Sequence, residues 1–116
     1  MYASRWGRKT LRYTFEWDPN KAKLNLRNHK VGFERAAEIF LDPLTISIFD
    51  EEHSDEEERW ITMGKDSREV VLVVVHTFRE VAADEWIIRI ISAWKATKNE
   101  IKQYEELWYE ERIWFF

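Results

Sequence analysis

The segment EVVLVVVHTF, from Glu69 to Phe78, limits the possible folds more than any other part of this 116-residue chain. Its residues are apolar at consecutive positions from Val70 to Val75, so a strand formed there presents apolar side chains on both of its faces. Strands of that kind lie in the middle of a sheet, where both faces are covered. The apolar run is also far too short to cross a bilayer. We therefore predict a central β-strand over this segment.

Segments in which apolar and polar residues alternate predict further strands. In RYTFEW, Tyr13, Phe15 and Trp17 alternate with polar residues, which is typical of a half-buried strand. Three more segments are predicted strands, namely residues 44–49, 59–65 and 86–93. We expect the last four predicted strands, residues 44–49, 59–65, 69–78 and 86–93, to form a β-meander. Residues 50–59 are expected to be an acidic loop and residues 79–85 a turn.

End signals and apolar spacing predict two helices near the N-terminus. Asp18 is a candidate N-cap and Pro19 suits the first helical position, so a helix is expected from Pro19 to about His29, ended by Gly32. A short second helix over residues 33–40 has apolar residues three and four positions apart, and it stops before Pro43.

A third helix opens with a capping box, because Glu100 follows Thr97 by three positions. An apolar stripe follows, so this helix should pack on the sheet; the stripe consists of Ile101, Tyr104, Leu107 and Trp108. The elements together predict an α+β fold: an antiparallel sheet of about four to five strands with two N-terminal helices and a C-terminal helix packed on it. The length predicts a single domain over residues 1–116.

Composition narrows the functional classes. The chain has no cysteine, which excludes disulfides and thiolate metal sites, and residues 1–11 lack the apolar run of a signal peptide, so we expect a cytoplasmic protein. Three glycines leave no Gly-rich phosphate loop, and the three histidines have no short metal spacing. We expect neither a metal nor a cofactor. The net charge of −4 is uneven, with seven carboxylates in DEEHSDEEER and basic stretches at residues 5–12 and 21–35.

Cationic and polar residues on several predicted elements could converge on a phosphodiester, because guanidinium groups bind phosphate oxygens in pairs. They are Lys21, Asn25 and His29 on one face of the first helix, Arg59, Arg79 and Arg89 on strands or strand ends, and Lys95 before the last helix. Several of these residues, and His76, also have a plain structural interpretation, which stays open. His29 can stabilise a helix end, His76 can be a hydrogen-bonded core histidine, Arg59 can pair with the preceding acids, and Arg89 can be paired or reach solvent.

Four segments, read in order, resemble the BrnT family of bacterial toxins, which is related in fold to RelE-type ribonuclease toxins. They are FEWDPNKAKLNLRNHKVGFERAAEIFLDP, DEEHSDEEERWITMGK, VVVHTFR and IRIISAWKATKNEIKQYEE, and the resemblance covers roughly Arg12 to Glu106. It implies a RelE-like toxin domain, a metal-independent endoribonuclease that cleaves RNA and arrests translation and growth. It also implies a BrnA-type ribbon-helix-helix antitoxin as partner, with operator DNA bound only through the toxin–antitoxin complex and no membrane partner.

The matching segments carry candidate site residues onto this chain. The resemblance implies catalytic roles for Arg59, Arg79, Arg89 and His53. We add Lys95, at the junction before the last helix, as a catalytic candidate, with Lys95 or a histidine as proton donor. The resemblance also implies substrate-binding roles for Lys21, Asn25, His29 and Ser92. We hypothesise that Trp94 also belongs to the substrate-binding residues and contacts RNA or the antitoxin. The same segments also supply Trp17, Glu57 and Thr77.

Trp94 departs from the family pattern, which has arginine after Ser-Ala. Indole can stack on a base but cannot neutralise a phosphate, so we hypothesise that this copy is attenuated. Three alternatives stay open. The chain can be an inactive homologue that binds the antitoxin and tunes operator occupancy, Trp94 can be a core aromatic, or Trp94 can be a cloning change that permits production of a toxic protein.

Overall fold

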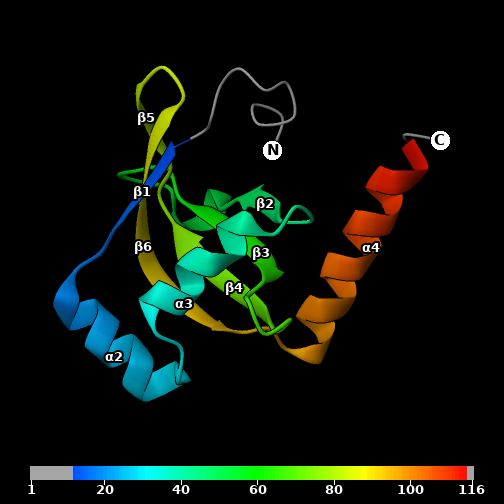
Figure 1. Cartoon of the computed structure of the whole chain (residues 1–116), viewed down its shortest axis with the longest axis horizontal. Coiled ribbons are helices and arrows are strands. Elements are labelled where there is room, and N and C mark those ends of the chain that lie inside the picture. Colours follow the sequence, from blue (N-terminus) through cyan, green and yellow to red (C-terminus); the bar gives the residue numbers. More distant parts are fainter. Residues whose placement is uncertain (1–11, 115–116) are drawn as a thin grey trace.

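The computed structural model describes residues 12–114, with side chains to Leu107, and in this part of the chain a mixed six-stranded β-sheet forms the centre (Figure 1). The strand order is β1-β6-β4-β3-β2, and β5 also pairs with β6. The strands are β1 (Arg12–Glu16), β2 (Ile46–Phe49), β3 (Trp60–Lys65), β4 (Val71–His76), β5 (Arg79–Ala82) and β6 (Glu85–Lys95). The helices are α2 (Pro19–His29), α3 (Phe33–Ala37) and α4 (Lys98–Trp114), with short 3-10 helices η1 (Glu38–Leu41) and η2 (Glu51–His53). None of the described helices is long and apolar enough to span a membrane.

β4 lies in the middle of the sheet, between β6 and β3, as its apolar sequence predicts. Leu72 and Val74 belong to the core cluster that includes residues of α3, whereas Val71 and Val73 belong to a second apolar cluster. The predicted meander of β2, β3, β4 and β6 is confirmed, because each neighbouring pair is antiparallel.

The sheet differs from the expected four to five antiparallel strands in two respects. β1 pairs in parallel with β6, from Arg12 beside Glu85 to Glu16 beside Arg89, so the sheet is mixed. Residues 79–85, expected to be a turn, contain β5, which forms an antiparallel hairpin with β6. Because β6 has 11 residues, its first half pairs with β1 and β5 and its second half pairs with β4.

α2 begins as predicted, because Asp18 Oδ1 accepts a hydrogen bond from the Asn20 backbone N–H at 2.8 Å and Pro19 follows the cap. Lys30, not Gly32, ends this helix, since Lys30 adopts the left-handed conformation with φ of 61°. The predicted second helix over residues 33–40 is divided into α3 and η1.

α4 extends away from the sheet and packs on it through its first turns (Figure 1). The predicted capping box is present, since the Glu100 N–H donates to Thr97 Oγ1 at 3.1 Å and the Thr97 N–H donates to Glu100 Oε1 at 2.8 Å. Tyr104 is buried in the second apolar cluster, and Ile101 and Leu107 pack beside it. The side chain of Trp108 lies outside the described residues.

Candidate functional site

Two of the predicted arginines meet at one cavity. Arg79 is the first residue of β5 and pairs with Ile87 of β6. Arg89 lies two positions after Ile87 on the same strand. The side chains of all three residues therefore lie on the face of the sheet opposite that of buried Ile88. We call this space of about 270 Å³ the arginine cavity, and its lining residues are Glu16, Glu57, Glu58, Thr77, Phe78, Arg79, Ile87 and Arg89. The topology therefore brings together three segments that are far apart in the sequence.

Arg89 is paired with Glu57 across this cavity. Its Nη2 donates to Glu57 Oε1 at 2.5 Å, which holds the acidic loop before β3 against β6. The two side chains are 35% and 43% exposed, and ion pairs that water reaches to this extent contribute little to stability. An incoming anion can therefore replace the carboxylate on Arg89 at small energetic cost.

Arg59 lies next to the arginine cavity without lining it. Trp60 is paired with His76, and the Thr77 N–H donates to the Arg89 carbonyl at 3.0 Å, so the backbones of Arg59, Thr77 and Arg89 follow one another across the sheet. Arg59 Nε is buried and has no hydrogen-bond partner among the described residues. A buried donor of this kind can bind an anion.

The remaining predicted catalytic residues lie elsewhere. Lys95 is at the far end of β6, six residues from Arg89, which corresponds to about 20 Å along a strand. His53 lines neither the arginine cavity nor its rim, because it is exposed on η2 with Nδ1 at 3.0 Å from Asp50 Oδ2. Lys21 is exposed on α2, the helix that packs at the Lys95 end of β6. The predicted arginines and lysines thus divide into two separate groups. One consists of Arg59, Arg79 and Arg89 at or next to the arginine cavity, and the other consists of Lys21 and Lys95 at the far end of β6.

Asn25 has a structural position. It is buried, its amide donates to the carbonyl oxygens of Val31 at 2.9 Å and Ala93 at 2.8 Å, and its carbonyl accepts from the Ala93 N–H at 3.0 Å. Asn25 therefore fixes α2 to β6 and leaves no donor for a substrate. Ser92 is half-buried on β6 beside Val75.

Trp94 is held by the start of α4. Its indole Nε1 donates to Glu100 Oε1 at 3.2 Å, its ring packs against the second apolar cluster, and the His29 ring lies 6.1 Å away. The interpretation of Trp94 as a packing aromatic therefore agrees with the structure. Trp94 lies five positions after Arg89 on β6 and does not line the arginine cavity.

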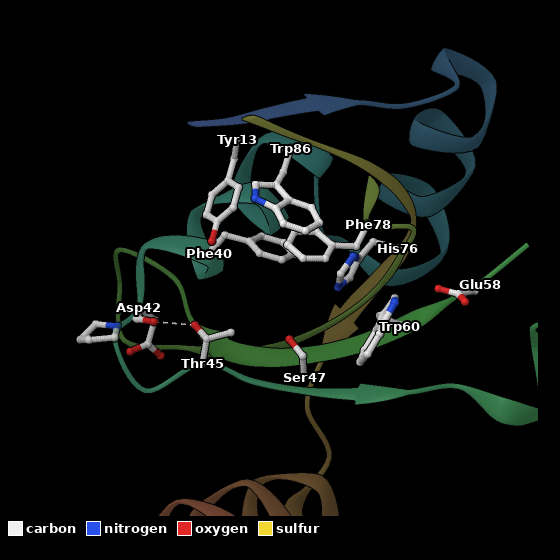
Figure 2. Close-up of a pocket in the computed structure, with 11 residues that line it drawn as sticks. Tyr13, Phe40, Asp42, Thr45, Ser47, Glu58, Trp60, His76, Phe78 and Trp86 are labelled. Carbon is white, nitrogen blue, oxygen red and sulfur yellow. Dashed lines mark hydrogen bonds between the residues drawn. The ribbon is translucent and has the colours of Figure 1, made fainter. Parts of the chain in front are cut away.

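A larger cavity, which the sequence did not predict, adjoins the arginine cavity. We call this space of about 490 Å³ the aromatic cavity; it is lined by Tyr13, Phe40, Asp42, Pro43, Thr45, Ser47, Glu58, Trp60, His76, Phe78 and Trp86 (Figure 2). Phe78 and Trp86 stack with ring centroids 4.3 Å apart and planes 6° from parallel. No sequence pattern connects these residues, because they come from five strands, the 3-10 helix η1 and three connecting segments.

His76 forms part of the wall of the aromatic cavity. It is 2% exposed, with Nδ1 at 2.8 Å from the Thr77 carbonyl and Nε2 at 2.5 Å from Thr62 Oγ1, whose other partner is Ser47 Oγ at 2.7 Å. The carbonyl accepts from Nδ1–H, so Nε2 accepts from Thr62. Burial lowers the pKa of His76 to about 4, which keeps the ring neutral at pH 7. The alternative of a hydrogen-bonded core histidine is confirmed.

Known proteins identify the class of this chain. The model of the family described as the BrnT ribonuclease toxin of type II toxin-antitoxin systems matches residues 17–100. The fold is similar to the crystal structure of the Brucella abortus ribonuclease toxin BrnT, with a TM-score of 0.51 and 22% sequence identity over 75% of this chain and 99% of that chain. No curated protein matches the sequence. Since the family model spans most of its length, the chain belongs to the BrnT family of ribonuclease toxins of type II toxin-antitoxin systems.

Proposed function

We propose that this chain is a metal-independent endoribonuclease that cleaves RNA at the arginine cavity. The observation that carries the proposal is the position of two guanidinium groups, Arg79 and Arg89, in one cavity with the carboxylate of Glu57. Guanidinium groups can bind a phosphodiester and neutralise charge that develops on it, and a carboxylate can accept a proton. Membership in a ribonuclease toxin family supports RNA as the substrate.

Glu57 has two successive roles in the proposed reaction. In the free protein it occupies Arg89, and a phosphate of the RNA replaces it there. Glu57 then takes the proton of the ribose 2′-hydroxyl while the 2′-oxygen bonds to phosphorus and the bond from phosphorus to the 5′-oxygen breaks. The 5′-oxygen takes a proton from water, which leaves a 2′,3′-cyclic phosphate and a 5′-hydroxyl. Arg79 and Arg89 stabilise the negative charge on the phosphorus oxygens during this step.

Arg59 is the proposed third cation. Its Nε is buried without a hydrogen-bond partner among the described residues, and its backbone lies next to that of Thr77, which lines the arginine cavity. Three arginines then balance the carboxylates Glu16, Glu57 and Glu58 around the substrate. Lys95 and His53 are not assigned catalytic roles here, because neither lines this cavity.

We propose that Trp94 attenuates this copy by weakening its binding of RNA, while the chemical step stays intact. The family pattern places an arginine at this position, and the arginine cavity lies about 16 Å away along β6. A cation there can hold a phosphate remote from the cleaved bond, which the indole cannot do. The chain should therefore cleave RNA, with weaker binding than a relative that has arginine.

The proposed partner is a BrnA-type ribbon-helix-helix antitoxin in the cytoplasm, with operator DNA bound only through the complex. The family description of a type II toxin-antitoxin system supports an antitoxin of some kind. Expression of the chain without its antitoxin should arrest growth and translation, and coexpression of the adjacent antitoxin gene should restore growth. Arg89→Gln, made in the same vector, should not arrest growth although it accumulates to the same level.

One observation favours a second candidate function, an inactive toxin homologue that binds the antitoxin and tunes operator occupancy. Trp94 fills the place of the family arginine with a side chain that is fully engaged in packing and in a bond to Glu100. This candidate requires that the wild-type chain does not arrest growth yet copurifies with the antitoxin. Growth arrest that depends on Arg89 excludes it.

A further inference from the structure

The aromatic cavity has the features of a binding site for a flat ring. Its volume of about 490 Å³ lies within the range of roughly 300–1,000 Å³ that small-molecule sites occupy. Figure 2 shows the stacked rings of Phe78 and Trp86 on one side, with Trp60 and Ser47 on strands across from them and Thr45 just before β2. Aromatic walls of this kind stack on nucleobases and make the contact tolerant of sequence.

The aromatic cavity and the arginine cavity meet at the end of β4. Phe78 and Glu58 line both of them, although Trp60 and His76 lie on one face of the sheet and Arg79 and Arg89 on the other. A strand of RNA that places a phosphate on the arginines can therefore place an adjoining base between the aromatic walls. The distribution of charge agrees with this arrangement, because none of the residues that line the aromatic cavity is lysine or arginine.

One carboxylate in the aromatic cavity is available to a ligand. Asp42 is already engaged, since its carboxylate accepts from the Lys65 N–H at 2.7 Å, the Leu44 N–H at 2.9 Å and the Tyr104 hydroxyl at 3.1 Å. Glu58 is exposed and has no hydrogen bond or ion pair within the part of the chain that the structure describes. A free carboxylate accepts two parallel N–H bonds, and guanine is the RNA base with two adjacent N–H donors, at N1 and N2.

We propose that the aromatic cavity binds a nucleobase of the RNA, with guanine preferred because Glu58 accepts its N1–H and N2–H groups. The inference rests on the proposed function for the neighbouring phosphate, whereas the base contact itself can be measured without cleavage. The rival occupant is an apolar side chain of the antitoxin, which the same variants distinguish.

Binding of uncleavable RNA tests the base contact. The probes are two fully 2′-O-methylated RNA hexamers that differ at one position, which is guanine in one and adenine in the other. Each hexamer is titrated into the protein, and calorimetry gives its affinity. Trp60→Leu should weaken binding of the guanine hexamer about tenfold, the loss expected for one stacked base. Phe49→Leu is the matched control, because the Phe49 ring lies 5.3 Å from that of Trp60 but lines neither cavity, and it should bind as the wild type does.

Glu58→Gln tests the preference for guanine. It should bind both hexamers equally, whereas Glu56→Gln, from the same exposed loop, should keep the preference. Thermal melting of each variant confirms that it is folded. Unchanged affinity in Trp60→Leu and an unchanged preference in Glu58→Gln would overturn the inference, and so would loss of antitoxin binding with RNA binding intact.

Cleavage assays separate this inference from the proposed function. RNA cleavage that requires Arg89 but has the same KM and cut sites in Trp60→Leu supports the function and overturns the base site. Guanine-dependent hexamer binding that requires Trp60, in a protein that cleaves no RNA, supports the base site and overturns the function.

Discussion

The Arg89 guanidinium donates to the Glu57 carboxylate at 2.5 Å, which connects β6 to the acidic loop before β3. Both groups are partly exposed, so the pair contributes about 0–1 kcal/mol to the free energy of unfolding. Its proposed importance is catalytic. The pair keeps the proposed general base, Glu57, in contact with the phosphate-binding cation, Arg89, until RNA separates them.

Glu57→Gln should therefore change catalysis much more than stability. We expect kcat to fall by about a hundredfold or more, because a glutamine cannot take the 2′-hydroxyl proton. The midpoint of urea unfolding should barely move. Glu56→Gln is the control and should behave as the wild type does. A Glu57→Gln enzyme with wild-type kcat would show that another group is the base.

Asn25→Ala should destabilise the fold. It removes three hydrogen bonds and leaves buried groups of Val31 and Ala93 without partners, which should lower the free energy of unfolding by about 3 kcal/mol. Urea denaturation measures this, with Asn28→Ala on the exposed face of the same helix as the control. Equal midpoints for the two variants would mean that Asn25 does not hold α2 to β6.

The secondary-structure elements that were predicted correctly are those marked by residues close together in the sequence. The apolar run of β4, the Asp18 and Pro19 start of α2, and the Thr97 and Glu100 capping box all lie within a few residues and all are confirmed. The sequence could not show that β1 pairs in parallel, because alternation reveals the buried face of a strand but neither its partner nor its direction. β5 was missed because all four of its residues are exposed.

The candidate site was only partly predictable for a similar reason. Arg79 and Arg89 could be chosen by charge, and the hairpin places them together. Arg89 and Lys95 are close in sequence but lie far apart, because a strand extends by about 3.3 Å per residue. The aromatic cavity could not be foreseen, since Tyr13, Trp60 and Trp86 meet only through the order of the strands.

His76 should make the protein less stable in acid. Its pKa is lowered from 6.5 to about 4 by burial, so between these values the unfolded chain binds a proton that the folded chain does not. Stability is then lost as the pH falls from 6.5 towards 4, by about 3 kcal/mol in total. Urea unfolding of the wild type and His76→Gln at pH 7 and pH 4.5 measures the difference. His53→Gln, at an exposed histidine, should keep the wild-type dependence.

Trp94→Arg should strengthen RNA binding. One added phosphate contact of about 1.5 kcal/mol should lower KM roughly tenfold and leave kcat unchanged, and binding should become more sensitive to salt. Trp94→Leu removes the indole without adding charge and should give no gain. A rise in kcat itself would place position 94 at the cleaved bond and contradict its assignment to a remote contact.

Cleavage of RNA by the purified protein, wild type against Arg89→Gln, tests the central claim most directly. The rate of single-turnover cleavage should fall by about a hundredfold or more in Arg89→Gln, because the charge on the phosphorus oxygens loses one of the two cations that line the cavity. Arg68→Gln, at an exposed turn outside the arginine cavity, should cleave at the wild-type rate. Equal rates for the wild type and Arg89→Gln would contradict the assignment of the arginine cavity as the site where RNA is cut.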